Sequence, residues 1–158
     1  ELDNAYFNKN LEIENYVTEF FWTLQKKSDL EGSNLESPQY QNLIGKNNIE
    51  KFQMTLDNYF LFFKKNSSEY FQYVTPYQYL NSNFENKIFF YSFSLHPEIT
   101  QPTGGLSLGD IGGKQFQIQL KDLIVDENNK IIFKIFFKKM SILTISNGKG
   151  KLAFYSKN

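Results

Sequence analysis

The serine at position 107 lies in the stretch whose spacing comes nearest to a catalytic motif. Residues 105–109 read GLSLG, which fits the G-x-S-x-G pattern of a serine nucleophile on a sharp strand-to-helix turn. That chemistry needs a helix directly after the serine and a histidine further along the chain. Here residues 110–113 read DIGG before a strand-like segment, and the single histidine, His96, precedes Ser107. The pattern favours a glycine-rich loop, and we predict that the protein is not an enzyme.

Residue types that usually hold metals and cofactors are scarce. The chain has no cysteine and one histidine, which excludes disulfides, thiolate sites and histidine-based metal sites. Its carboxylates are scattered without the spacing of a calcium loop. Residues 113–114 read GK, as at the end of a phosphate-binding loop, but Leu108 replaces that motif's first glycine and Gln115 its hydroxyl. We therefore predict no catalytic residue, no metal site and no cofactor.

The charge balance argues against direct binding of nucleic acid. Seventeen lysines balance seventeen acidic residues, the net charge is zero, and there is no arginine. Nucleic-acid binders usually carry a basic surplus and use arginine for bidentate contacts. Lysines alternate with aromatic residues at positions 133–139, a pattern that would also suit a base-stacking platform. The neutral charge favours the alternative, with aromatics in the core and Lys138 and Lys139 outside, where they oppose aggregation of a sheet edge.

The elements that would position these residues are strands. In residues 115–120, Phe116, Ile118 and Leu120 alternate with three glutamines, which predicts one buried and one solvated face. Trp22 is in phase with its apolar neighbours two positions away on either side, so we place it in the core rather than on a sugar-binding surface. Further strands are expected at residues 16–25, 51–57, 88–95, 131–138, 141–145 and 151–155.

One short helix is expected among these strands. Asn66 is a plausible N-cap, Glu69 follows it at the spacing of a capping box, and Pro76 is expected to end the helix. Asn66 also begins a glycosylation sequon. Short antiparallel strands with one helix favour a β-sandwich or jelly roll over a barrel. The length predicts one domain, residues 1–158, with residues 1–10 as a linker or a first strand.

Residues 88–98, IFFYSFSLHPE, followed by QPTG at 101–104, are similar to the most characteristic segment of the major capsid proteins of nucleocytoplasmic large DNA viruses. Other segments also resemble this family, in the family's order along the chain. The strand-like stretch YVTEFFWTLQ at 16–25 also resembles its counterpart in the family. The same holds for YF at 70–71 with PYQ at 76–78, and for GKLAFYS at 150–156. The resemblance covers residues 11–156 approximately.

The resemblance implies a fold and a set of partners. The family fold is two jelly rolls in tandem, and the matched segments belong to the second, so this chain is expected to be an eight-stranded antiparallel jelly-roll β-sandwich that pairs with an N-terminal jelly roll. Family members form homotrimers with a pseudo-hexagonal outline that tile an icosahedral shell. We therefore expect self-association, a place in the virion capsid, and assembly in the host cytoplasm. Minor capsid proteins and a viral inner membrane nearby are further expected neighbours.

The loop that contains Gln101 is the strongest candidate assembly element. Pro102 fixes φ near −65° and Gly104 permits a positive φ, so the chain can turn tightly between two strands. Pro97, Gln101, Pro102, Gly104 and Trp22 are the candidate structural and assembly residues. Residues 105–108 read GLSL where the family usually has Asn-Phe-Ser, and the family's arginine is absent. These departures leave a virophage capsid protein or a poxvirus-type assembly scaffold as alternatives. The competing hypothesis from a different class is a carbohydrate- or protein-binding β-sandwich module.

Overall fold

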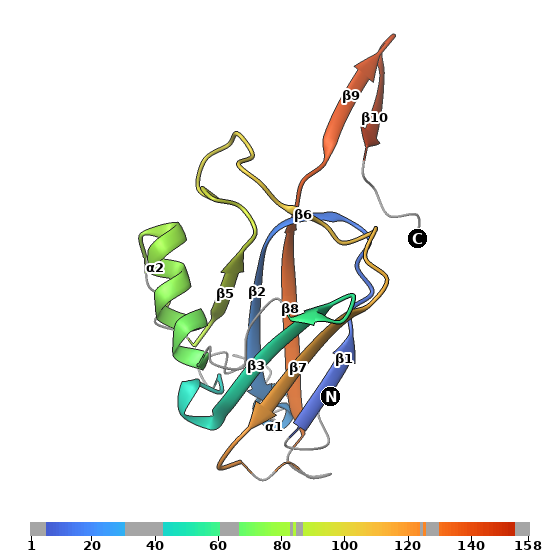
Figure 1. The fold of residues 1–158 in the computed structure, drawn as a ribbon. Helices are drawn as coiled ribbons and strands as arrows, with labels where there is room; N and C mark the ends of the chain where they lie inside the picture. Colours follow the sequence, from blue (N-terminus) through green and yellow to red (C-terminus); the bar gives the residue numbers. More distant parts are fainter. Residues whose placement is uncertain are drawn as a thin grey trace.

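The computed structural model of the chain describes residues 6–30, 43–60, 67–82, 84, 87–123, 125 and 130–153. Two antiparallel sheets face each other, and a hairpin projects from one end (Figure 1). The strands are β1 (Tyr6–Asn10), β2 (Tyr16–Lys26), β3 (Ile49–Leu56), β4 (Tyr59–Phe60), β5 (Phe89–Ser92), β6 (Leu106–Ser107), β7 (Lys114–Leu120), β8 (Ile131–Lys139), β9 (Ile142–Ser146) and β10 (Lys149–Ala153). The helical segments are α1 (Lys27–Leu30), a 3-10 turn at Lys46–Asn48, a π-helical turn at Tyr70–Val74, and α2 (Thr75–Leu80).

The first sheet is organised around β2, its longest strand. β2 pairs with β8 along one side, and with β5 and β6 along the other. The second sheet has the order β1-β7-β3-β4, with β7 between β1 and β3. The pairings within both sheets are antiparallel. The prediction of an antiparallel all-β protein is confirmed.

Aromatic side chains fill the space between the two sheets, and Trp22 lies at their centre. Its ring is fully buried and contacts Phe52 of β3 and Phe116 of β7, with centroid distances of 5.2 and 5.4 Å. Phe89 of β5 and Phe71 of the helical segment also pack against Trp22. Aromatic pairs of this kind contribute about 0.5–1.5 kcal/mol each beyond the burial of their area. The in-phase position of Trp22 in β2 predicted this core placement.

The period-two pattern also predicts the inner faces of β7 and β8. Phe116, Ile118 and Leu120 are buried as expected. Phe133, Ile135 and Phe137 of β8 are partly buried and pack against the same core. Phe133 and Phe137 therefore face inward as expected, whereas the expectation is wrong for Phe136, which is 57% exposed on the opposite face of β8.

The helical segment covers the outer face of the first sheet beside β5 (Figure 1). Phe90, on the outer face of β5, contacts Tyr79 and Phe84, and the Thr75 hydroxyl donates to the Phe90 carbonyl at 2.6 Å. Because helix and core cover opposite faces, both Phe89 and Phe90 are fully buried. Among the described residues, no helix is long and apolar enough to cross a membrane.

The prediction that Pro76 ends the helix is wrong. Pro76 lies inside α2, which ends at Leu80 and has Asn81, whose φ is 51°, as its C-cap. A proline ring normally crowds the carbonyl four residues earlier. Here the turn before it is π-helical, and the Thr75 backbone N–H donates to the Tyr70 carbonyl, five residues back. The wider turn accommodates the ring. Asn66, the expected N-cap and the first residue of the glycosylation sequon, lies outside the described residues.

The remaining strands differ from the predictions mainly in their ends. β5 covers only the first half of the expected strand at residues 88–95, because the chain bends away after Ser92. β9 and β10 form a hairpin close to the positions expected. Residues 6–10 form β1, which pairs with β7. The described part of the chain has ten strands, compared with the eight expected. Eight of them have at least four residues, and the two shorter strands are β4 and β6.

Candidate functional site

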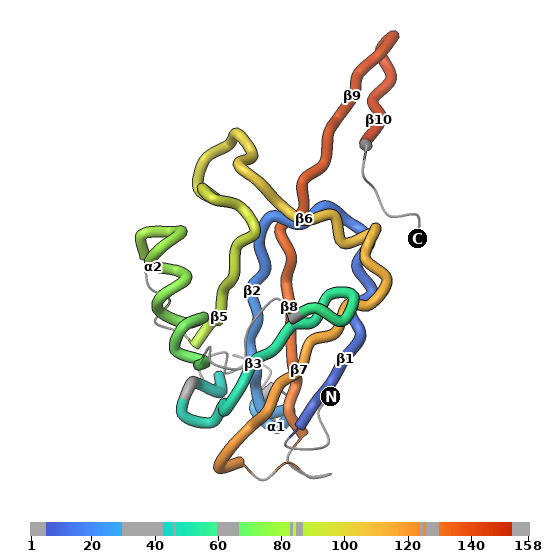
Figure 2. Tube along the Cα trace, viewed as in Figure 1, coloured from blue at the N-terminus to red at the C-terminus, as the bar shows by residue number. Residues whose placement is uncertain are grey.

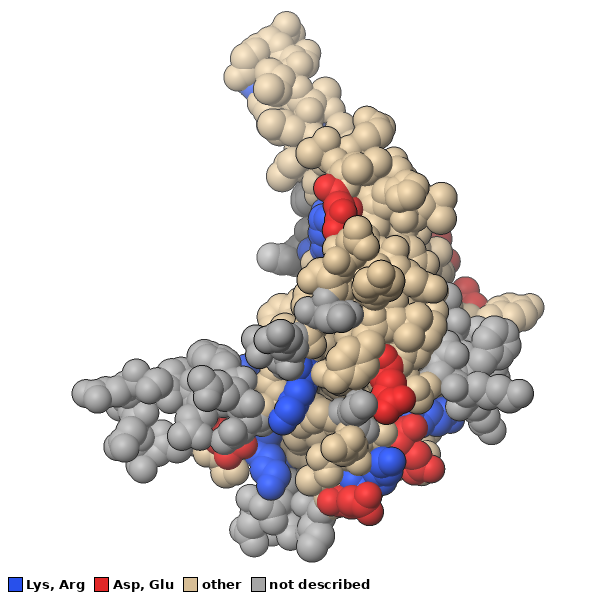
Figure 3. All heavy atoms as spheres, turned by 90° about the vertical axis from the view of Figure 1, so that its left-hand side faces the viewer, with Lys and Arg blue, Asp and Glu red and all other residues tan. Residues whose placement is uncertain are grey.

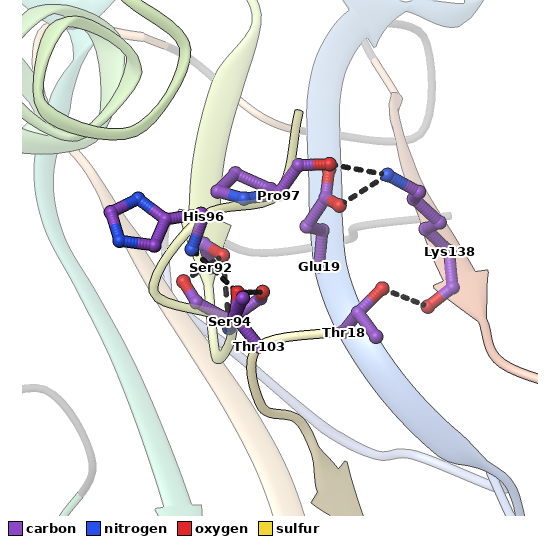
Figure 4. A network of polar contacts seen from close by, with 8 residues as sticks. All are labelled: Thr18, Glu19, Ser92, Ser94, His96, Pro97, Thr103 and Lys138. Carbon is purple, nitrogen blue, oxygen red and sulfur yellow. Dashed lines mark hydrogen bonds and ion pairs between the residues drawn. The ribbon is translucent and has the colours of Figure 1, made fainter. Parts of the chain in front are cut away.

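Residues 93–105 form the loop that joins β5 to β6, and they include four of the five candidate assembly residues. Figure 4 shows this loop beside β2 and the end of β8, with polar side chains from all of these elements converging. Between them lies a shallow hollow of about 130 Å³, which His96, Pro97 and Ile99 line from the loop and Glu19 and Lys138 from the sheet. The fifth candidate, Trp22, lies in the core and is separate from this loop.

A β-bulge in β2 provides the attachment point for the start of the loop. The register between β2 and β8 shifts between Val17 and Glu19, which leaves Thr18 as an extra residue. Its carbonyl accepts hydrogen bonds from the backbone N–H groups of Phe93 at 2.8 Å and Ser94 at 3.3 Å. Its hydroxyl donates to the Lys138 carbonyl at 3.2 Å. The bulged residue thus binds both the loop and β8.

Hydroxyl groups close the loop on itself. The Thr103 hydroxyl lies 2.7 Å from that of Ser94 and accepts the backbone N–H of His96 at 2.7 Å. The Ser92 hydroxyl donates to the Ser94 carbonyl at 2.8 Å and accepts the Ser94 N–H at 3.0 Å. Because Ser92 and Ser94 are buried, these bonds hold the two ends of the loop together in a fixed geometry.

Gly104 has the backbone geometry that the sequence predicts. Its φ is 137°, a region that L-residues with a side chain rarely adopt. A Cβ at this position would lie 3.1 Å from the carbonyl oxygen of Phe93 at the start of the loop, so a larger residue would also require the backbone there to shift. Gln101 and Pro102 are exposed at the outer end of the loop, whereas Pro97 is buried.

A buried carboxylate anchors the middle of the loop. Glu19 is in register with Lys138 across the β2–β8 pair, and its side chain is only 4% exposed. The Lys138 ammonium donates to Glu19 Oε1 at 2.6 Å and to the Pro97 carbonyl at 3.0 Å. Lys138 therefore bridges the sheet and the loop, a role that its outward-facing position in the sequence did not indicate. The sequence feature that could have indicated this pairing is the acidic residue Glu19 within the otherwise largely apolar strand β2.

The polar contacts of this region bind the loop to the sheet. Within the described residues, no cluster of histidine, cysteine and carboxylate side chains could hold a metal ion. Ser107 lies in β6, where its hydroxyl donates to Asp110 at 2.7 Å, and a turn rather than a helix follows it. The backbone N–H of His96 is bound by Thr103 in the loop. Ser107 therefore lacks the strand–turn–helix geometry of a nucleophile elbow.

Sequence comparison relates this chain to viral coat proteins. The family model described as "Large eukaryotic DNA virus major capsid protein" matches residues 1–151. The chain is 32% identical over 92 residues to the major capsid protein of Phaeocystis pouchetii virus, an alignment that covers 58% of this chain and 18% of the relative. It is 30% identical over 92 residues to the major capsid protein of Chrysochromulina ericina virus, covering 58% of this chain and 16% of that protein.

Structural comparison agrees at the level of the fold. The crystal structure of VP54 from PBCV-1, fitted into a reconstruction of the virophage Sputnik, superposes with a TM-score of 0.75 at 17% identity. The superposition covers 96% of this chain and 46% of VP54. The chain therefore spans about half the length of this structure and a smaller part of the sequence relatives. The likeness confirms the predicted jelly-roll sandwich.

Proposed function

The chain belongs to the family of major capsid proteins of large eukaryotic DNA viruses, and on that basis we propose that it is a shell-forming part of such a capsid protein. The observation that carries the proposal is the family match over residues 1–151, which includes the core strands and the loop after β5. Because members of this family are structural proteins, the prediction that the chain is not an enzyme is confirmed.

The architecture supports a role that depends on shape and stiffness. The core is densely aromatic, with Trp22 in contact with rings from three strands and a helix. Well-packed interiors of this kind resist deformation. The burial of Trp22 also counts against the alternative of a carbohydrate-binding module that uses it as an exposed platform. A capsid subunit needs a stiff body with defined loops, and both are present.

We also propose where this chain lies in the complete protein. It is the second, C-terminal jelly roll of a double jelly-roll protein, packed beside an N-terminal jelly roll. The complete protein forms homotrimers of pseudo-hexagonal outline that tile an icosahedral shell, after assembly in the host cytoplasm. Minor capsid proteins and a viral inner membrane are expected neighbours in the virion.

The loop after β5 is proposed as an assembly contact near the base of the capsomer or against the first jelly roll. Its outer end, Gln101 and Pro102, is exposed in this chain, while Thr103 and Gly104 hold its geometry. An exposed tip on a fixed base suits a contact that must form without a large ordering cost. Radical footprinting of the complete protein should show Gln101 and Pro102 protected in assembled particles. Equal reactivity in subunits and particles would contradict this placement.

Sedimentation velocity of the complete protein, with electron microscopy of the same sample, tests the proposed function. We expect trimers or larger lattices at micromolar concentration. A monomer that persists under all conditions would refute the shell function and favour a binding module. The change Thr103→Val removes the hydroxyl that holds the loop and should reduce lattice formation, whereas Thr100→Val, at an exposed position in the same loop, should not.

A further inference from the structure

The turn that joins β9 to β10 contains the only Asn-Gly pair of the chain, Asn147 and Gly148. Both residues have positive φ, 51° and 73°, and Ser146 pairs with Lys149 across the turn. A two-residue hairpin turn with positive φ at both positions is type I′, for which Asn-Gly is a preferred sequence. Asparagine is thermally labile, and a glycine after it lacks the side chain that would shield the backbone nitrogen. The turn therefore places a labile side-chain amide beside an unshielded backbone nitrogen.

The structure leaves both of these groups open. Asn147 and Gly148 are exposed, and a Cβ at position 148 would have no neighbouring atom within 4 Å. Within the described part of the chain, neither the Asn147 side chain nor the Gly148 N–H makes a hydrogen bond. Figures 1 and 2 show the turn at the far end of the projecting hairpin, and in Figure 3 this arm stands clear of the body. Water and base therefore reach the turn.

We propose that Asn147 is a site of spontaneous deamidation. The Gly148 backbone nitrogen, after losing its proton, attacks Cγ of Asn147, and the new N–Cγ bond closes an imide ring as the Cγ–Nδ2 bond breaks. Nδ2 takes up a proton from water and leaves as ammonia. A second water then opens the imide at either carbonyl, which leaves aspartate or isoaspartate at position 147. The net reaction is hydrolysis of the side-chain amide, and it needs no oxidant and no reductant.

The position of the pair in the hairpin permits the motion that ring closure requires. The Gly148 nitrogen reaches Cγ only when the backbone rotates at Asn147, so a turn clamped by its surroundings would react slowly. Here the four residues 146–149 at the end of the hairpin are all exposed. Exposed loop tips open locally at a small fraction of the free energy of global unfolding. Opening of this end alone is therefore sufficient for the reaction.

A second turn of the same chain provides an internal comparison. Asp57 and Asn58 form the two-residue turn between β3 and β4, and they also have positive φ, 45° and 70°. Here Tyr59 follows the asparagine, and the Asp57 carboxylate accepts the Gly113 N–H at 2.7 Å, which ties this turn to the body. Asn58 therefore precedes a shielded nitrogen in a backbone that is held in place. We expect Asn147 to deamidate while Asn58 remains an amide.

The isoaspartyl product changes the geometry of the hairpin. Its main chain runs through the former side-chain carbonyl and contains an extra carbon, whereas a type I′ turn is built from two ordinary residues. The pairing of Ser146 with Lys149 then cannot keep its register. Either product also adds a carboxylate, which makes the net charge of zero negative. We expect deamidation to loosen the hairpin as the protein ages.

Peptide mapping of the complete protein, kept folded in mildly alkaline buffer, tests the site. We expect aspartyl and isoaspartyl forms at Asn147, at a rate that rises about ten-fold per unit of pH because the attacking nitrogen must lose its proton. Gly148→Ala should slow the reaction roughly ten-fold, since its Cβ crowds the nitrogen whether or not the variant keeps the turn. If Asn147 stays intact in the folded protein but reacts in urea, or reacts no faster than Asn58, the proposal is overturned.

Amide hydrogen exchange tests the structural consequence. The isoaspartyl form, separated from the unmodified protein by anion exchange, should exchange faster in β9 and β10, whereas β2 and β8 should keep their protection. Equal exchange of the hairpin in the two forms would contradict the loosening. Neither measurement depends on the shell function, which the sedimentation experiment tests separately.

Discussion

The change Lys138→Met tests how the buried carboxylate holds the loop to the sheet. It keeps most of the side-chain length but removes the ammonium group that binds Glu19 and the Pro97 carbonyl. Removing one partner of a fully buried ion pair costs about 3–5 kcal/mol, whereas an exposed pair contributes about 0–1 kcal/mol. Glu19 is 4% exposed and Lys138 54%, so water can partly replace the lost ammonium. We expect the free energy of unfolding to fall by about 2 kcal/mol.

The assay is equilibrium unfolding in urea followed by fluorescence of Trp22. Trp22 is the single tryptophan of the chain and is fully buried, so its emission should report loss of the core. The matched control is Lys139→Met, an exposed lysine on the same strand, which should change stability by less than about 0.5 kcal/mol.

A double-mutant cycle separates the ion pair from general packing. Glu19→Gln removes the buried charge and should cost about 1 kcal/mol. Combined with Lys138→Met, it should be less destabilising than Lys138→Met alone, because no uncompensated carboxylate remains. If Lys138→Met is no more destabilising than Lys139→Met, the ion pair does not anchor the loop and the reasoning fails.

Three further predictions concern the loop, the core and alkaline pH. Gly104→Ala should lower the free energy of unfolding by about 1–3 kcal/mol, since φ is 137° and the Phe93 carbonyl is close, whereas Gly112→Ala should be nearly neutral in the same urea assay. Trp22→Ala should cost about 3–5 kcal/mol in thermal unfolding followed by circular dichroism, and a smaller loss would contradict its central position. Burial raises the pKa of Tyr91 to about 12, above its value near 10 when unfolded, so stability present below pH 10 should fall between about pH 10 and 12. Tyr91→Phe should reduce that alkaline loss, and an unchanged pH profile would refute the assignment.

The sequence predicts the strands and their buried faces because burial on one side of a sheet imposes a period of two. Phe116, Ile118 and Leu120 follow that rule, and so does Trp22. The rule applies where a strand has one buried face and one solvent-exposed face. It does not apply at β5, where Phe89 and Phe90 are both buried because a helix covers the outer side.

The parts that escaped prediction depend on contacts between distant segments. The bulge at Thr18 follows from the register with β8, and nothing in the local sequence marks it. The pairing of Glu19 with Lys138 joins residues 119 positions apart. The path of the helix through Pro76 needs a π-helical turn, which a rule that treats proline as a helix breaker does not include. The candidate loop was located from its Pro and Gly residues, but its hydroxyl network was not.

The central position of β2 has a consequence for how the protein is made. β2 leaves the ribosome well before its long partner β8, which follows more than a hundred residues later, since Glu19 and Lys138 are 119 positions apart. At about 5–20 residues per second, translation takes roughly 6–24 s to supply that partner. Throughout this interval, the edge of β2 that will pair with β8 has no neighbouring strand. We expect the nascent chain to depend on chaperones until β8 emerges, so the supply of chaperones would limit the yield of folded subunits.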